Sequence, residues 1–204
     1  MNSFNALRRL LTTCLFATST FAVAAPTLLV SNGLLTEAKN VNVDGTFYDV
    51  KFALGSCDQV FNGCAESAFT FHTNESAQAA GKALLEQVYI DSPEGNFGSW
   101  PYNVPGCNTY DYCLSYVPYG YRDTAWTSEF PIFVFARAFH FYSNRLPDFV
   151  DGDVGYYPNV YITGDYSNFA VFTLSDEQPV PEPASLALVG LALFGMIALR
   201  RRSN

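Results

Sequence analysis

The alternation of apolar and polar residues predicts that most of the interior of this 204-residue chain is β-structure. Residues 40–43 and 46–52 alternate on either side of Asp44-Gly45, a dipeptide typical of a type I′ hairpin turn. Other strands are expected where aromatic and β-branched residues are concentrated. These segments are residues 27–30, 69–72, 109–116, 132–142, 160–163 and 169–174.

One segment has the periodicity of a helix. Between residues 74 and 89, small and apolar side chains recur every three or four positions, and Thr73 or Asn74 can cap the N-terminus. The members of this apolar stripe are Ala77, Ala80, Leu84 and Val88. Residues 91–130 are rich in Gly, Pro, Asn and Tyr, which favours long loops with short strands. We therefore predict an α+β fold for residues 25–174, with one mostly antiparallel sheet and a single packed helix.

The N-terminus differs from this body because it has the parts of a secretory signal peptide. Arg8 and Arg9 precede an apolar run over residues 10–23, and Ala22 and Ala24 form a small-x-small cleavage site. We therefore expect export through the Sec machinery, with residues 1–24 removed by cleavage after Ala24.

The C-terminus has an uncharged, mostly apolar run, residues 184–199, followed by Arg200, Arg201 and Arg202. At 1.5 Å per residue, such a run forms a helix about 24 Å long, which is short for a bilayer but sufficient with local thinning. Arginines that follow a membrane helix stay in the cytoplasm, which places the body outside. We therefore predict a transmembrane helix with a basic tail.

Directly before this helix lies the segment Val180-Pro181-Glu182-Pro183-Ala184-Ser185. With the helix and the arginines, it resembles the PEP-CTERM sorting signal of Gram-negative bacteria. The resemblance implies transient anchoring in the inner membrane, cleavage by a membrane-embedded exosortase near Pro181-Glu182-Pro183, and transfer from the periplasm to the cell surface. Such proteins often accompany exopolysaccharide and biofilm genes. The expected parts are a signal peptide (1–24), a body (25–174), a linker (175–180) and a sorting signal (181–204).

Four cysteines remain after Cys14 leaves with the signal peptide. An even number of cysteines in an oxidising compartment indicates disulfides, for which three connectivities are possible. We favour the two local pairs, Cys57 with Cys64 and Cys107 with Cys113. The alternative is a zinc site built from all four, but six and five intervening residues exceed the usual ligand spacing.

Acidic residues dominate the charge of the body. Nineteen acidic and six basic residues lie between Glu37 and Glu182, a net charge near −13. Such a surface repels nucleic acid and anionic lipid, so neither is expected as a partner. Asp148, Asp151 and Asp153 form the densest cluster and are only weak calcium candidates, because their spacing does not match an EF-hand and a solvated turn is the favoured interpretation. No cofactor is expected.

Catalytic chemistry has few candidate residues. His72 and His140 could each act as a general base, but each alternates with aromatic residues on an expected strand, which is typical of structural histidines. The chain contains no Gly-x-Ser-x-Gly elbow, His-Glu-x-x-His motif or phosphate loop. We therefore expect no catalytic residues and no enzymatic activity, with a small secreted hydrolase as the less favoured alternative.

Tyrosines and tryptophans are concentrated around the Cys107 loop. Exposed aromatic rings stack on sugars, but the same residues also fill the cores of sheets. Carbohydrate binding, for example to an exopolysaccharide, is therefore an alternative function. The residues concerned are Trp100, Tyr110, Tyr112, Tyr116, Tyr119, Tyr121 and Trp126. The leading hypothesis is an exported, non-enzymatic protein of the cell envelope or extracellular matrix.

Overall fold

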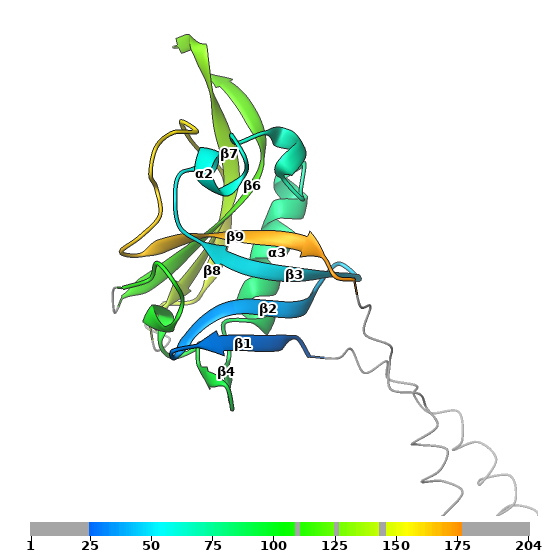
Figure 1. The fold of residues 1–204 in the computed structure, drawn as a ribbon, viewed down its shortest axis with the longest axis vertical. Helices are drawn as coiled ribbons and strands as arrows, with labels where there is room; N and C mark the ends of the chain where they lie inside the picture. The colour runs from blue at the N-terminus through cyan, green and yellow to red at the C-terminus, as the bar shows by residue number, and fades with distance from the viewer. Residues whose placement is uncertain (1–24, 109–110, 125–126, 143–145, 177–204) are drawn as a thin grey trace, which may run out of the picture. The chain divides into compact units, whose positions relative to one another are not determined.

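A seven-stranded sheet forms the frame of the body (Figure 1). The computed structural model describes residues 25–108, 111–124, 127–142 and 146–176. The strand order is β1-β2-β3-β9-β6-β7-β8, and every neighbouring pair is antiparallel except β6 with β9. The strands are β1 (Thr27–Ser31), β2 (Leu34–Val43), β3 (Thr46–Ala53), β6 (Tyr112–Thr124), β7 (Thr127–Phe141), β8 (Phe149–Tyr156) and β9 (Ser167–Leu174). The predicted α+β class with one mostly antiparallel sheet is confirmed.

The main helix is α3 (Asn74–Gln87), which ends two residues earlier than predicted. It begins where the Thr73 hydroxyl accepts a hydrogen bond from the backbone N–H of Ser76, so Thr73 is the cap. The four residues of the predicted apolar stripe are all buried. The smaller elements are α2 (Cys57–Val60), the 3-10 helices η2 (Glu66–Ala68) and η3 (Pro101–Asn103), and a hairpin of β4 (Asp91–Ser92) with β5 (Gly95–Asn96).

Helix α3 packs on one face of the sheet, which we call the helix face. Gly81 allows a close approach there, because a Cβ at this position would lie 3.2 Å from Cγ1 of Val150. At its C-terminal end, the Gln87 side chain donates to the carbonyl of Asn42 (2.7 Å) and accepts from its N–H (2.9 Å). Since β1 pairs with β2 only as far as Lys39, this amide satisfies backbone groups that no neighbouring strand reaches.

The opposite face, which we call the outer face, has its own buried cluster of aromatic residues. Phe169 lies at its centre, 5.4 Å from the ring of Phe61 in an edge-to-face arrangement. The segment that contains α2 and η2 covers this cluster, and Figure 1 shows α2 on the opposite side of the sheet from α3. The buried members are Cys57, Phe61, Cys64, Phe69, Leu114, Tyr116, Phe133, Phe135 and Phe169.

The predicted hairpin is confirmed. Strands β2 and β3 pair up to Val43 and Thr46, and the two residues between them both have positive φ, 50° at Asp44 and 89° at Gly45. A type I′ turn requires this conformation at both central positions, which asparagine, aspartate and glycine adopt most readily. The local sequence therefore determines this part of the sheet.

Two predicted strands are wrong. Residues 69–72 connect η2 to α3 outside the described sheet, and residues 160–163 form only an isolated bridge, between Tyr161 and Ser56. Residues 69–72 are apolar because Phe69 and Phe71 are buried against the sheet, whereas Val160 and Tyr161 in the second segment are exposed. Phe69 packs on the outer face and Phe71 on the helix face, so the connection passes from one core to the other.

The long loops expected over residues 91–130 are partly wrong as well. Figure 1 shows β6 and β7 as a long hairpin that projects beyond the other strands, and β6 runs through residues 117–124, which were expected to be loop. Strand β8 was not predicted, because Gly152 and Gly155 interrupt its apolar pattern. Pairing with the apolar strand β7 holds it in the sheet despite its weak intrinsic strand propensity.

Candidate functional site

The residues predicted to direct sorting lie outside the described part of the chain. They are Ala22, Ala24, Pro181, Glu182, Pro183, Arg200, Arg201 and Arg202, and the predicted membrane helix over residues 184–199 lies outside it too. Among the described residues, no helix is both long and apolar enough to cross a bilayer. The described part of the chain ends at residue 176, three residues before the sorting motif would begin in the sequence.

Ser175 is the last buried residue before that point, directly after β9. Its backbone N–H donates to the carbonyl of Phe47 (3.0 Å), and its hydroxyl donates to Oδ1 of Asp49 (2.5 Å). Lys39 binds the other carboxylate oxygen of Asp49 at 2.6 Å. We call Lys39, Asp49 and Ser175 the exit cluster. Both contacts of Ser175 are to β3, and Lys39 of β2 holds Asp49 in place, so the chain is fixed to the sheet up to residue 175.

In the exit cluster, Asp49 and Lys39 stabilise each other's charges. Burial acts to raise the pKa of Asp49, but hydrogen bonds from Lys39, Ser175 and the Asn40 N–H outweigh burial and hold this pKa below its ordinary value. The hydrogen bonds from Lys39 to Asp49 and to Glu37 in turn raise the pKa of Lys39. Both groups therefore keep their charges at neutral pH.

A shallow cavity of about 380 Å³ adjoins the exit cluster. It is lined by residues from the start of β1 and the end of β9, which lie on the same side of the sheet (Figure 1). The lining residues are Thr27, Lys39, Asn40, Asp49, Ser175 and Asp176. The two ends of the body are thus neighbours in space.

Both local disulfides favoured from the sequence are present. The Cα atoms are 5.0 Å apart in Cys57–Cys64 and 5.2 Å apart in Cys107–Cys113. The first closes the α2 segment over the outer face, where the carbonyl of Cys64 accepts a hydrogen bond from the hydroxyl of Tyr121. The second lies at the helix face. With all four cysteines bonded in pairs, the alternative zinc site has no thiolates to use.

The acidic cluster predicted in a turn is instead spread along and beside a strand. Asp151 lies in β8 and forms a two-pronged ion pair with Arg137, with contacts of 2.9 and 2.5 Å. Asp148 precedes β8 and binds His140, while Asp153 belongs to β8 without a described side chain. Within the described ranges, no group of three or more His, Cys, Asp or Glu residues could hold a metal ion.

The two histidines differ in environment. His72 is exposed just before α3. His140 is only 2% exposed, and its Nδ1 lies 2.8 Å from Oδ2 of Asp148 while its Nε2 lies 2.8 Å from the carbonyl of Phe97. One ring nitrogen of His140 thus faces a carboxylate and the other faces a backbone carbonyl. Both ring nitrogens are therefore occupied by structural contacts.

A buried polar network that the sequence did not reveal lies beside His140. The Tyr89 ring stacks on the His140 ring at 5.0 Å, and its hydroxyl hydrogen-bonds to the Ser115 hydroxyl. Burial raises the pKa of Tyr89. Ser115 donates to Oδ1 of Asn168 (2.8 Å), whose amide donates to the carbonyl of Pro105 (2.9 Å). The network connects α3's end, β6, β9 and the Cys107 loop, and only the fold brings these residues together.

The aromatic cluster predicted in loops is not one surface. Tyr116 and Tyr119 are buried in β6, and Tyr121 packs on Phe69 with a ring separation of 6.2 Å. Trp100 instead contacts Tyr102 and Tyr142, whereas Tyr110 and Trp126 lie outside the described residues. Strand β6 places Tyr112, Tyr116 and Tyr121 on the outer face and Tyr119 on the helix face, which the expectation of a loop could not foresee.

A different set of aromatic residues is accessible on the outer face. The rings of Phe139 and Phe149 stack at 4.3 Å, with Phe141 6.3 Å from Phe139. The guanidinium of Arg137 lies 4.8 Å from the centre of the Phe139 ring, and Phe149 is 45% exposed. We call Arg137, Phe139, Phe141, Phe149 and Asp151 the outer aromatic cluster. It combines apolar rings with the ion pair of Arg137 and Asp151, whose opposite charges cancel.

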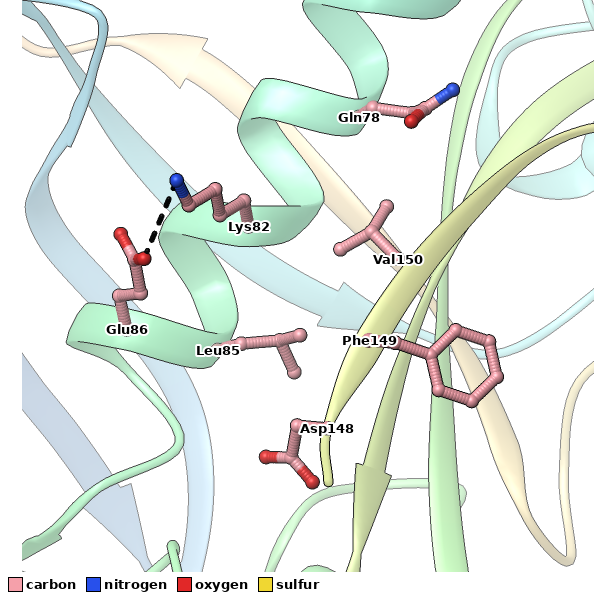
Figure 2. A pocket seen from close by; sticks show the side chains of 7 residues that line it. All are labelled: Gln78, Lys82, Leu85, Glu86, Asp148, Phe149 and Val150. Atoms are coloured by element: carbon pink, nitrogen blue, oxygen red, sulfur yellow. Dashed lines mark ion pairs between the residues drawn. The ribbon is translucent and has the colours of Figure 1, made fainter. Parts of the chain in front are cut away.

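The helix face has a groove of about 560 Å³ between α3 and the start of β8 (Figure 2). Figure 2 shows Leu85 and Val150 pointing into the groove from opposite sides, whereas the ring of Phe149 points away from the helix. Lys82 and Glu86 form an ion pair of 3.6 Å at the rim. The groove is thus a gap between helix and strand with an apolar floor.

Comparison with known proteins identifies the tail. Residues 179–202 match the family model of the PEP-CTERM protein-sorting motif. No curated protein and no solved structure matches the chain. The chain therefore carries a PEP-CTERM sorting motif. This motif supports an exported protein that is sorted by exosortase, with transit through a membrane-anchored form before release.

Proposed function

We propose that this protein is a non-enzymatic component of the cell envelope or extracellular matrix, delivered by its PEP-CTERM motif. The observation that carries the proposal is the motif at residues 179–202, which begins four residues after the buried Ser175. The exit cluster supports it, because this cluster holds the body together up to residue 175 and involves none of the residues that the motif matches.

The use of the reactive side chains supports a structural rather than a catalytic role. Both ring nitrogens of His140 bind fixed acceptors, and the four body cysteines are in disulfides. Asp148, which would orient a catalytic histidine, also accepts the backbone N–H of Phe141 at 2.8 Å. These groups join segments of the fold, so we assign them a structural role.

Intact-mass measurement tests the delivery. We expect protein from the cell surface to lack residues 1–24 and the helix after Pro181-Glu182-Pro183, because the Sec peptidase and exosortase each remove one end. Replacing Glu182 by Ala should trap a membrane-bound form that keeps the helix, whereas replacing Glu177 by Ala, an acidic residue before the matched motif, should not. Surface protein that keeps residues 184–204 in a strain with active exosortase would contradict the proposal.

Carbohydrate binding is a second candidate, favoured by the outer aromatic cluster. Its rings offer an apolar surface, and the ion pair of Arg137 and Asp151 beside them offers hydrogen-bond donors and acceptors. Replacing Phe149 by Ala should weaken retention on a neutral polysaccharide column at least threefold, whereas replacing the exposed Leu174 by Ala should not. Equal retention of both variants and the native protein would exclude this cluster.

A further inference from the structure

The cavity beside the exit cluster carries more negative than positive charge. Among its six described lining residues, Lys39 is the only cation. Two carboxylates share this one ammonium group, at 2.6 Å from Asp49 and at 2.5 Å from Glu37 of the same strand. Asp176, which is exposed, adds another carboxylate to the lining. Three carboxylates therefore surround one ammonium group, and the cavity favours a second cationic group.

Asn40, which also lines the cavity, contributes an acceptor that lacks a donor. Its side-chain Oδ1 is buried and has no hydrogen-bond partner among the described residues. In the β1–β2 register, Thr27 lies opposite Lys39. Continued by one residue, this register brings Pro26 next to Asn40, and proline has no N–H to donate. Buried acceptors without a donor are rare in folded proteins, so this atom indicates a donor that enters the cavity.

We propose that this cavity binds the α-ammonium group that signal-peptide cleavage creates at Ala25. Hydrolysis of the peptide bond after Ala24 leaves a carboxylate on the signal peptide and a cation with three N–H donors on Ala25. Ala25 is exposed and lies two residues before Thr27, which lines the cavity, so its nitrogen is within about 7 Å of Thr27. There the ammonium donates to Oδ1 of Asn40 and to the carboxylate of Asp176. This inference rests on the first cleavage of the proposed delivery.

This contact exists only in the processed protein. In the full chain the nitrogen of Ala25 is an uncharged amide, so it does not balance the charge of Asp176. After cleavage, the ammonium connects the start of β1 to residue 176, which lies three residues before the matched motif. Removal of the signal peptide at one end of the body thus adds a contact at the other end, where the chain continues toward the sorting motif.

Chemical labelling of the processed protein recovered from the host tests the contact. N-terminal sequencing comes first, and a chain that does not begin at Ala25 would overturn both this inference and the proposed first cleavage. Acetic anhydride acylates only the uncharged amine, so at pH 7 the α-amine should react about threefold more slowly in the native protein than in Asp176→Asn.

The matched control is Asp165→Asn, which removes an exposed carboxylate just before β9, at the opposite end of this strand from Ser175. Its α-amine should react at the native rate. Equal rates in the native protein and in Asp176→Asn, in chains that begin at Ala25, would overturn the inference and leave the proposed delivery intact.

The pH dependence of stability provides a second test. A carboxylate partner raises the pKa of the folded α-ammonium, so its stabilisation is complete below the unfolded pKa of about 8 and disappears as the pH rises through the folded pKa. The urea midpoint of the processed native protein should therefore exceed that of Asp176→Asn at pH 7, and the two midpoints should converge by about pH 10.

The other charged groups around the ammonium do not titrate in this range. They are Glu37 and Lys39 on β2, Asp49 on β3 and Asp176 after β9, and the raised pKa of Lys39 keeps that side chain charged. A difference between the midpoints that persists unchanged at high pH would assign the effect of Asp176 to Lys39 and overturn the inference.

Discussion

The two faces of the sheet are buried by different means. The helix face is covered mainly by one regular element, α3, whose small residues allow close packing against β7 and β8, with the Cys107–Cys113 segment beside it. The outer face is covered by the irregular segment around α2, held by the Cys57–Cys64 disulfide and by aromatic rings. A regular helix satisfies its own backbone, whereas an irregular cover needs covalent and aromatic support. The comparison predicts which changes affect each face.

The largest effects should come from truncating the core of either face. Phe169→Ala on the outer face should reduce the free energy of unfolding by about 3–5 kcal/mol, and Leu84→Ala on the helix face by about 2–5 kcal/mol. Both side chains are fully buried. Urea unfolding followed by fluorescence measures the two losses. A loss below about 1 kcal/mol for Phe169→Ala alone would mean that the outer face is not a packed core.

The next effect is that of the disulfides. Replacing Cys57 and Cys64 by Ser should cost about 2–3 kcal/mol, because the unfolded chain regains the entropy of an open loop. Replacing Cys107 and Cys113 should cost as much or more, since Asn168 contacts both sulfur atoms. Non-reducing peptide mapping of the native protein checks the pairing. A link from Cys57 to Cys107 would contradict both expectations.

Loss of the first disulfide should also affect the two faces unequally. Hydrogen exchange should increase around α2 on the outer face, whereas α3 should keep its protection, because the helix does not depend on that crosslink. Equal loss of protection on both faces would show that the two cores open as one unit.

The two histidines provide a smaller and more specific test. His140→Phe should reduce stability by about 1–3 kcal/mol, because the carboxylate of Asp148 and the carbonyl of Phe97 lose their hydrogen-bond partner. His72→Phe is the matched control, and its exposed position predicts a change within about 0.5 kcal/mol. Thermal unfolding of both variants decides the matter. Equal losses of stability in the two variants would mean that the contacts of His140 do not stabilise the fold.

The smallest effect should be the pH dependence of the stability that the exit cluster contributes. The contacts of this cluster are electrostatic and lie outside the outer-face core. The folded pKa of Asp49 is lowered, so its stabilisation is complete above the unfolded pKa of about 3.9 and disappears as the pH falls through the folded pKa. The native protein should therefore be more stable than Asp49→Asn at pH 7, with the difference shrinking in acid. Urea midpoints from pH 7 downward measure it, and a constant difference would contradict this account.

The sequence alone determined the features that depend on neighbouring residues. The Asp44-Gly45 turn, the face of α3 and the sorting motif are each encoded within a short segment, so turn chemistry, periodicity and motif spacing were enough. The local disulfides belong to the same group, because their short loops made the favoured pairs close in space.

Only the tertiary structure decided the rest. Strand β8 has weak intrinsic propensity and exists because β7 pairs with it, and residues 69–72 look like a strand but cross between two cores. The contact of His140 with Phe97 and the network from Tyr89 to Asn168 join residues that are distant in the chain. Such contacts arise from packing among elements, which local sequence patterns do not specify, whereas turns, helices and sorting motifs are fixed by residues that are already adjacent.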